Sequence, residues 1–242
     1  MIEVRQLAKR FGKVEALRDI TFRAGDGRVT GLLGPNGAGK STTLRILYTA
    51  IQPDSGSATI DGHDCTHEPL AVRRSLGVLP HATGLYPNLT ARENIRYYGE
   101  LHGLSGEALE RSIDSLIARL DLADVADRRA HGLSQGQRIK VALARALVHS
   151  PRNVILDEPT NGLDVMAIRT LRDLIRQLRD EGRCILLSSH VMQEIGALCD
   201  DLVIIGKGRV VLQGSPDEVR AATGCDNLEE AFVQLSQAEQ PA

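Results

Sequence analysis

The sequence is short of aromatic residues and of cysteine, and both shortages exclude classes of protein. Tryptophan is absent, and aromatic residues make up 3% of the 242 residues. Proteins that bind single-stranded nucleic acid usually stack bases on aromatic side chains, so this composition argues against such a site. The four cysteines show no C-x-x-C spacing. We therefore expect reduced thiols rather than disulfides or a zinc site at Cys65, Cys184, Cys199 and Cys225.

Long apolar runs and an excess of one charge are also missing. No run approaches the about 20 apolar residues of a membrane span, and the charged N-terminus, MIEVRQLAKRFG, lacks the apolar segment of a signal peptide. The formal net charge of −2 argues against a nucleic-acid-binding surface over the whole protein. We expect a cytoplasmic protein without a nucleic-acid partner. The length fits one large α/β domain, or one domain with an inserted subdomain.

A phosphate-binding loop is present at residues 34–41, GPNGAGKS. It matches the pattern G-x-x-x-x-G-K-S/T. Residues 29–33 (VTGLL) predict a buried strand before it, and apolar residues spaced i, i+3, i+4 and i+7 over 44–51 predict a helix after it. Backbone N–H groups at such a turn form an anion site. Lys40 can reach the terminal phosphates of a nucleotide and Ser41 can ligate Mg²⁺, and the flanking strand and helix argue against a chance glycine turn.

The remaining pattern divides the chain into two strand-bearing parts and a helical part. Alternating residues over 2–7 and 16–22 predict an antiparallel start. Helical periodicity follows in the middle of the chain, with capping boxes at 90–93 and 134–137. We expect a single domain with these parts: the whole domain at 1–236, its core at 1–84 and 150–236, a helical subdomain at about 85–149, and a polar tail at 237–242.

Two apolar runs that end in polar residues predict central parallel strands. Residues 153–157 (NVILD) precede Glu158, and residues 184–187 (CILL) lead through two serines to His190. In open α/β sheets, ligands bind at the carboxyl ends of the strands. Nucleotide hydrolysis needs a carboxylate for Mg²⁺, which suits Asp157, and a base for the attacking water, which suits Glu158. The alternatives are two solvated acids at a turn and a structural histidine.

These motifs resemble those of the ATP-binding subunits of bacterial ABC transporters. The phosphate loop, LSQGQ at 133–137, VILDEPTNGLD at 154–164 and SSH at 188–190 follow one another in the order and spacing of that family, over roughly residues 2–234. LSQGQ is the discriminating motif, because other P-loop ATPases and kinases lack it. The resemblance implies a P-loop NTPase fold of the ABC type: an α/β protein with a mostly parallel core sheet, an antiparallel N-terminal β subdomain and an inserted helical subdomain.

The resemblance also implies which residues bind ATP and Mg²⁺. Phosphates and Mg²⁺ are bound by the loop residues Gly34, Pro35, Asn36, Gly37, Ala38, Gly39, Lys40, Ser41 and Thr42. The signature, which contacts the γ-phosphate bound to the opposite subunit, comprises Ser134, Gly136 and Gln137. Phe11 is the adenine-stacking position, although the residues alone fit a surface or core aromatic side chain equally well.

The same resemblance assigns the catalytic groups. Asp157 is the acid on the Mg²⁺ side and Glu158 the catalytic base. Asp164 is an acid between subunits, and His190 is the switch that contacts the γ-phosphate. Two such chains are expected to sandwich two ATP molecules, so that hydrolysis drives opening and closing of the pair.

One position departs from the family. A glutamine usually follows the strand that ends near Leu79, where it reaches Mg²⁺ and the attacking water and relays to the membrane partner; here His81 stands instead. No glutamine occurs between Gln52 and Gln135. A neutral imidazole can ligate or accept a hydrogen bond, but its reach and pH response differ. We therefore include His81 among the catalytic residues and expect slower or more pH-sensitive hydrolysis.

The expected function is that of a transporter motor, a subunit that hydrolyses ATP with Mg²⁺ on the inner face of the cell membrane. Its partners would be a separate polytopic permease and a second ATPase subunit, identical or not. The missing glutamine and the segments TGLYPNLTARENI and SSHVMQEIGALCD are similar to sodium-efflux ABC ATPases and to drug-export ATPases of the same exporter branch. The solute therefore stays open between sodium and a drug or other small molecule.

Two other functions are compatible with a phosphate loop. A soluble ABC-type ATPase that acts on DNA or ribosomes usually has two nucleotide domains or a long coiled coil, and neither is visible here. A P-loop kinase would leave LSQGQ unexplained. For the transporter, the permease is expected to dock near residues 81–98 through an exposed apolar patch, although these residues could also fill the subdomain's own core. The candidates are Leu85, Tyr86, Leu89, Tyr97 and Tyr98.

Overall fold

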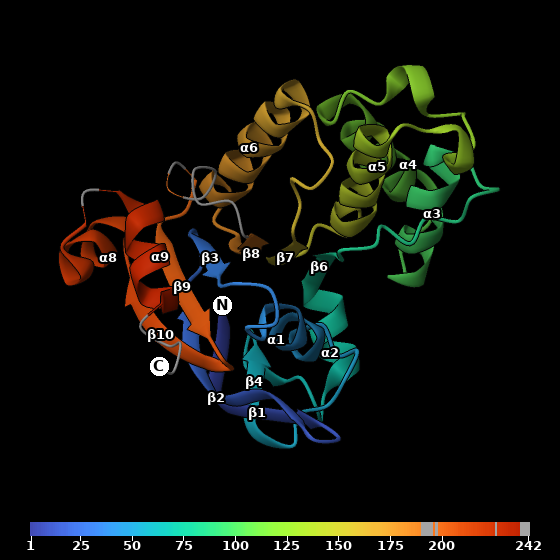
Figure 1. The fold of residues 1–242 in the computed structure, drawn as a ribbon. Helices are drawn as coiled ribbons and strands as arrows, with labels where there is room; N and C mark the ends of the chain where they lie inside the picture. The colour runs from blue at the N-terminus through green and yellow to red at the C-terminus, as the bar shows by residue number, and fades with distance from the viewer. Residues whose placement is uncertain (190–195, 197, 226, 238–242) are drawn as a thin grey trace.

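A single ten-stranded sheet organises the computed structural model, which describes residues 1–189, 196, 198–225 and 227–237 (Figure 1). The strand order is β5-β4-β1-β2-β10-β9-β3-β8-β7-β6. The strands are β1 (Ile2–Phe11), β2 (Val14–Ala24), β3 (Val29–Leu33), β4 (Ser55–Ile60), β5 (His63–Asp64), β6 (Leu76–Leu79), β7 (Asn153–Asp157), β8 (Cys184–Ser189), β9 (Asp201–Gly206) and β10 (Arg209–Gly214). The helices are α1 (Lys40–Leu47), α2 (Pro69–Ser75), α3 (Ala91–Leu101), α4 (Gly106–Arg119), α5 (Gln135–Leu147), α6 (Val165–Asp180), α8 (Pro216–Thr223) and α9 (Leu228–Gln237), with 3₁₀ turns at Ala123–Val125 and Ala130–Gly132.

The parallel half of the sheet contains β6, β7, β8, β3 and β9. Its registers pair Leu79 with Leu156, Asp157 with Ser188, and Leu33 with Ser189. Parallel strands in this register end at one edge, so the loops after β3, β6 and β7 emerge at the same edge of the sheet. The strands predicted at 29–33, 153–157 and 184–187 are confirmed as β3, β7 and β8.

The other half of the sheet is antiparallel around β1. This strand pairs with β2 on one side and with β4 on the other, which confirms the antiparallel start predicted from alternation. The β9–β10 hairpin joins the two halves, because β10 pairs in parallel with β2 and β9 pairs in parallel with β3. The α/β fold expected from the sequence, with its mostly parallel core and antiparallel N-terminal strands, is confirmed.

The alternation of side chains along the central strands separates two hydrophobic cores. In β7, Val154 and Leu156 face one core and Ile155 faces the other, and all three are fully buried. The second core contains Leu44 of α1 and Val72 of α2, packed between the parallel strands and the antiparallel sheet. In Figure 1, α6 lies on the opposite side of the central strands from α1. Helices thus cover both faces of the parallel strands.

Residues between β6 and β7 form the predicted helices α3, α4 and α5, which gather beyond the β6 edge of the sheet (Figure 1). Both predicted capping boxes are present. Thr90 accepts from the Glu93 N–H at the start of α3, and Ser134 accepts from the Gln137 N–H at the start of α5. The boundaries proposed for a separate subdomain, at about 85 and 149, remain a prediction.

Two local expectations need correction or addition. The helix after the phosphate loop was expected to continue through Ile51, but α1 ends at Leu47 and Thr49 has a φ of 62°. Tyr48 and Ile51 nevertheless pack against the second core, so their apolar spacing reflects burial rather than helix. The short helix α8 was not predicted, although Ser215, Pro216 and Glu218 form a capping box with proline in the first turn.

The four cysteines are free thiols, as expected. Burial raises the pKa of Cys65 to about 12 and that of Cys184 to about 11, which makes these thiols unreactive. Across the part of the chain that is described, none of the helices combines the length and the apolar character needed to cross a bilayer.

Candidate active site

The phosphate loop joins β3 to α1 through glycines that the packing requires. A Cβ on Gly34 would lie 2.3 Å from the Ile205 carbonyl oxygen, and a Cβ on Gly39 would lie 2.6 Å from Leu17 Cδ2. Gly39 also has a φ of 113° and precedes the first residue of α1. Any side chain at either position would displace backbone or core. The loop is therefore fixed in place at the N-terminus of α1, with the free N–H groups of the first turn beside it.

The β9–β10 turn supports the loop from the antiparallel side. The Gly208 N–H donates to the Ala38 carbonyl at 3.0 Å, and the Gly208 carbonyl accepts from the Arg18 N–H at 2.8 Å. One residue thus connects the phosphate loop to β2. This contact joins three segments that are far apart in the sequence.

Lys40 is the buried cation of the site. Its side chain is 6% exposed, and its ammonium donates to the Gly34 carbonyl at 2.5 Å and to the Pro35 carbonyl at 3.2 Å. Burial lowers the pKa of Lys40, while the charges of Glu158 and Asp157 oppose that shift. The ammonium therefore lies within the electrostatic reach of both acids, and an anion in the loop would replace the two carbonyls as its partner.

Asp157 ends β7 and Glu158 follows it, and the two acids lie in different environments. Asp157 is 3% exposed, and its Oδ1 accepts from the Ser188 hydroxyl at 2.7 Å. The same hydroxyl oxygen accepts from the Glu158 N–H at 2.9 Å. Glu158 has a φ of 52°, a left-handed conformation that costs a non-glycine residue about 1 kcal/mol or more. Ser188 of the neighbouring strand therefore orients both acids, which the sequence motif alone did not indicate.

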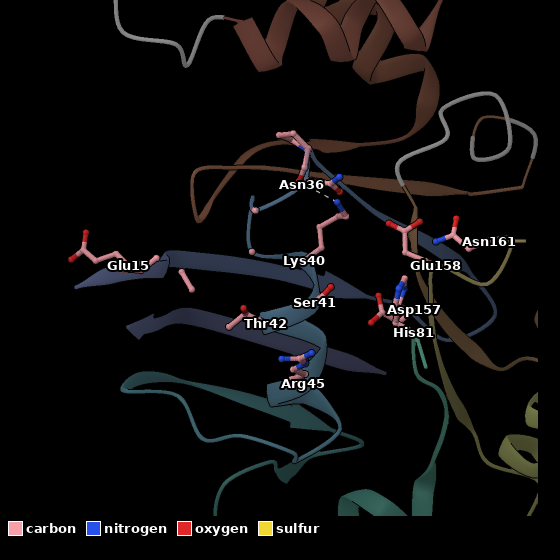
Figure 2. Close-up of a pocket in the computed structure, with 15 residues that line it drawn as sticks. Glu15, Asn36, Lys40, Ser41, Thr42, Arg45, His81, Asp157, Glu158 and Asn161 are labelled. Atoms are coloured by element: carbon pink, nitrogen blue, oxygen red, sulfur yellow. Dashed lines mark hydrogen bonds between the residues drawn. The ribbon is translucent and has the colours of Figure 1, made fainter. Parts of the chain in front are cut away.

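These groups line one pocket of about 630 Å³, within the range of about 300–1,000 Å³ typical of small-molecule sites. Figure 2 shows His81, Asp157 and Glu158 toward one end, Glu15 at the other, and Lys40 and Ser41 between them. The lining residues are Val14, Glu15, Ala16, Pro35, Asn36, Gly37, Gly39, Lys40, Ser41, Thr42, Arg45, His81, Asp157, Glu158 and Asn161. The phosphate loop, apart from Gly34 and Ala38, thus meets both acids and His81 at one pocket.

Other predicted site residues lie elsewhere. Ser134, Gly136 and Gln137 do not line the pocket, and the Ser134 hydroxyl is engaged in the α5 capping box. Asp164 caps α6 by accepting from the Ala167 N–H at 2.8 Å. The signature nevertheless lies close to the residue before Asp164, since a Cβ on Gly136 would lie 3.6 Å from Leu163 Cδ2.

Phe11 and His190 complete the predicted set. Phe11 ends β1 with its side chain 48% exposed, and the Lys9 ammonium lies 5.7 Å from its ring centroid. It does not line the pocket, so adenine stacking remains a prediction. His190 lies outside the described residues. Its neighbour Ser189 ends β8, which is the strand next to β7.

Sequence reasoning missed several lining residues. Val14, Glu15 and Ala16 come from β2, and only the sheet topology places that strand beside the phosphate loop. Arg45 and Asn161 also line the pocket. Arg45 was detectable, because it follows Ser41 by four residues and therefore shares its helix face.

Comparison with known proteins identifies the family. A model of the ABC transporter family matches residues 17–161. The chain is 39% identical over 238 residues to the ABC transporter ATP-binding protein NatA of Bacillus subtilis, which covers 96% of this chain and 97% of that protein. It is 36% identical to the daunorubicin resistance ATP-binding protein DrrA3 of Streptomyces coeruleorubidus, over 95% of this chain and 72% of that protein. A solved ATP-binding subunit of an ABC transporter matches with a TM-score of 0.91 at 32% identity, covering 97% of this chain and 99% of that one.

The chain therefore belongs to the ABC transporter family, as one of its ATP-binding subunits, and is an ATP hydrolase of that type. The resemblance drawn from the motifs is confirmed.

Proposed function

We propose that this chain hydrolyses ATP with Mg²⁺ at the pocket described above and drives solute export through a separate membrane permease. One observation carries the proposal: the buried Lys40 and the two acids that end β7 face the same pocket as the phosphate loop. Cation, carboxylates and loop amides are the groups that phosphoryl transfer to water requires.

The residues present fit Mg²⁺. Asp157 offers a buried carboxylate and Ser41 an exposed hydroxyl, both in the same pocket, and oxygen ligands of this kind suit the ion. Among the described residues, no group of three or more His, Cys, Asp or Glu side chains is arranged to hold a metal by itself. Nucleotide phosphates and water would therefore complete the coordination, as is usual for Mg²⁺. The ion would neutralise charge that develops on the phosphates.

The chain's own groups divide the reaction between them. Lys40 transfers its hydrogen bonds from the loop carbonyls to the phosphates and stabilises their charge. Glu158 accepts a proton from the attacking water as the water oxygen bonds to the γ-phosphorus. The bond between the γ-phosphorus and the bridging oxygen then breaks, and ADP and phosphate leave. The fixed backbone of Glu158, held by Ser188, aims its carboxylate into the pocket.

A second ATPase subunit would supply the signature. Residues 133–137 and Asp164 lie outside the pocket of their own chain, yet Ser134 begins α5 with a capped N-terminus suited to an anion. We propose that Ser134, Gly136 and Gln137 of one copy contact the γ-phosphate held by the other, with Asp164 and His190 acting near the same junction. Whether the second subunit is identical is decided by the test below.

The permease would dock on a tyrosine patch, which we define as Tyr86, Tyr97 and Leu101. These side chains are 45%, 39% and 63% exposed, and the rings of Tyr86 and Tyr97 meet edge to face at 5.3 Å. Leu85 and Tyr98, also named from the sequence, instead pack against the hydrophobic core. Docking here would hold the chain to the inner face of the cell membrane.

Export is supported by the relatives and by the segments compared above. DrrA3 is named for resistance to a drug, and the segments after β6 and β8 are similar to those of sodium-efflux ATPases. We therefore propose Na⁺ as the first solute to test and a drug or other small molecule as the second.

The test is the variant Glu158→Gln. It should lower the rate of ATP hydrolysis by about 10²–10⁴-fold, because it removes the general base, and it should retain ATP and form a stable dimer. Hydrolysis assays and light scattering with Mg-ATP measure both effects. A tagged copy purified from detergent-solubilised membranes should bring a polytopic membrane protein with it. Glu107→Gln, on the exposed face of α4, is the matched control.

Two results would contradict the proposal, and a monomer in Mg-ATP would decide the identity of the second subunit. Hydrolysis at the normal rate by Glu158→Gln would rule out this base. A monomer in Mg-ATP would rule out pairing of identical copies and leave a different second subunit. Co-purification of ribosomal proteins or DNA without a membrane protein would replace the transporter function with a soluble one.

A further inference from the structure

Arg145 is a buried cation for which the proposed reaction gives no role. It lies near the end of α5, and its side chain is 4% exposed. Burial lowers the pKa of its guanidinium, and the polar groups that oppose this shift are Tyr98 and Tyr86 rather than an acid. Among the described residues, no carboxylate forms an ion pair with it. A buried charge without a counter-charge is costly, so its contacts indicate what it stabilises.

Two contacts fix the guanidinium. It donates to the Gly84 carbonyl at 3.0 Å, and it lies 4.4 Å from the centroid of the Tyr98 ring, a favourable cation–π distance. Gly84 follows His81 by three residues in the segment between β6 and α3. Arg145 thus links α5, the helix that begins at the signature, to the segment that carries His81 into the ATP pocket.

The His81 segment has little other support. In the described structure, the bond from Arg145 to Gly84 is the one hydrogen bond that residues 81–85 make. Anchoring resumes at Tyr86, whose N–H donates to Asn94 Oδ1 at 2.9 Å and whose carbonyl accepts from Asn94 Nδ2 at 3.1 Å. Loss of the arginine would remove the one hydrogen bond of these five residues and leave the segment held only by the packing of Leu85 against the hydrophobic core.

The same cation lies beside the tyrosine patch. Tyr98, which stacks on Arg145, contacts Tyr97 edge to face at 5.8 Å between ring centroids. A partner that moves Tyr97 would therefore act on Tyr98, on Arg145 and on the Gly84 carbonyl in turn. Each step is a direct contact between described groups.

We propose that Arg145 is a positioning residue that holds the 81–85 segment against α5, keeps His81 at the ATP pocket and links that pocket to the tyrosine patch. This inference rests on the proposed function, because it assigns Arg145 a part in the same hydrolysis. It makes no contact with the pocket itself, so it acts through His81.

The test combines kinetics with a direct observation of His81. In the full-length chain, Arg145→Gln should lower kcat about tenfold and leave the KM for ATP and the Kd of a fluorescent ATP analogue within twofold. The double variant with His81→Ala should be no slower than the slower single variant, because both changes remove the same contribution. Arg145→Lys retains a donor for Gly84 and should recover part of kcat.

The NMR signal of histidine labelled with ¹³C at Cε1 reports the surroundings of His81, which a purely structural role of Arg145 would not change. The His81 resonance, identified by its loss in His81→Ala, should shift or broaden in Arg145→Gln. Arg96→Gln is the matched control, since Arg96 pairs with Glu110 in the same helical part and forms no hydrogen bond with residues 81–85 in the described structure. It should leave the His81 resonance unchanged.

Additive losses of kcat in the double variant would overturn the inference, as would an unchanged His81 resonance or a normal kcat for His81→Ala beside a slowed Arg145→Gln. If Arg145→Gln does not fold, the same comparison of single and double variants can be made with Arg145→Lys, whose expected loss of kcat is smaller, about threefold. The two proposals fail separately, because the Glu158→Gln test does not involve Arg145.

Discussion

At the scale of single residues, space and backbone conformation decide where glycine is required. Gly39 and Gly62 both have positive φ, 113° and 83°, but only Gly39 is enclosed: a Cβ there would meet Leu17 and the Ala16 carbonyl, while Gly62 has nothing within 4 Å. The pair separates the cost of an unusual backbone from the cost of a clash.

We expect Gly39→Ala to weaken ATP binding at least tenfold, because the loop must shift to admit the methyl group. Gly62→Ala should leave the Kd unchanged and lower the free energy of unfolding by about 1 kcal/mol, the usual cost of left-handed backbone. Fluorescent-nucleotide titration and urea denaturation measure the two quantities. Equal affinities in the two variants would show that the enclosure of Gly39 does not matter.

His81 is the second residue-scale case. It lines the same pocket as Asp157 and Glu158, so a part in the proposed hydrolysis remains a prediction. Imidazole side chains change charge between about pH 5 and 8, and carboxamides do not. We expect His81→Gln to alter the rate of ATP hydrolysis and its dependence on pH. Identical rates, Mg²⁺ dependence and pH profiles for both proteins would remove His81 from the reaction.

At the scale of elements, a histidine pair joins two helices to the sheet. His102 ends α3 and His149 follows α5; their rings stack at 3.6 Å with 7° between planes. His149 Nε2 also bonds the Leu76 carbonyl of β6 at 3.2 Å. Burial lowers the pKa of both residues, and the charges of His102 and Arg183 help lower that of His149 to about 4. Protonation of His149 would therefore oppose the contact between helices and sheet.

This arrangement predicts that the free energy of unfolding falls in mild acid. The folded state binds fewer protons at His149 than the unfolded state between about pH 4 and 6.5. The contribution of His149 to the free energy of unfolding therefore falls as the pH drops through that window. Between pH 7.5 and 5.0, the free energy of unfolding of the wild type should fall by on the order of 1–2 kcal/mol more than that of His149→Gln. Urea denaturation at pH 7.5 and 5.0 gives the difference. His131→Gln, at an exposed site, should behave as the wild type, and an equal acid loss in all three proteins would refute the argument.

Element boundaries show where pattern reading succeeded. Capping boxes at Thr90 and Ser134 located the starts of α3 and α5, because the cap is made by residues adjacent in the sequence. The end of α1 was placed too late, since Ile51 is buried by tertiary packing after the helix has ended. Local rules therefore find helix starts well, and burial outside a helix imitates its periodicity.

At the scale of the whole molecule, the tyrosine patch and the ATP pocket lie at opposite ends of the segment after β6. We expect Tyr97→Asp to abolish co-purification of the permease with the Glu158→Gln chain, since a charge would have to be buried in the docked surface. The Kd for ATP should stay within twofold. Leu70→Asp, at another exposed apolar side chain, is the control and should retain the permease. Equal permease recovery from both variants would place the docking surface elsewhere.

The sequence by itself determined the phosphate loop, the acids that end β7, the signature helix and hence the family, because each of these depends on residues that are close in the chain. Only the tertiary structure decided that Ser188 holds both acids, that β2 and the Gly208 turn enclose the phosphate loop, and that Arg145 supports the segment of His81. Those contacts join residues from 30 to 190 positions apart. Sheet order and helix packing bring them together, and no local pattern records either.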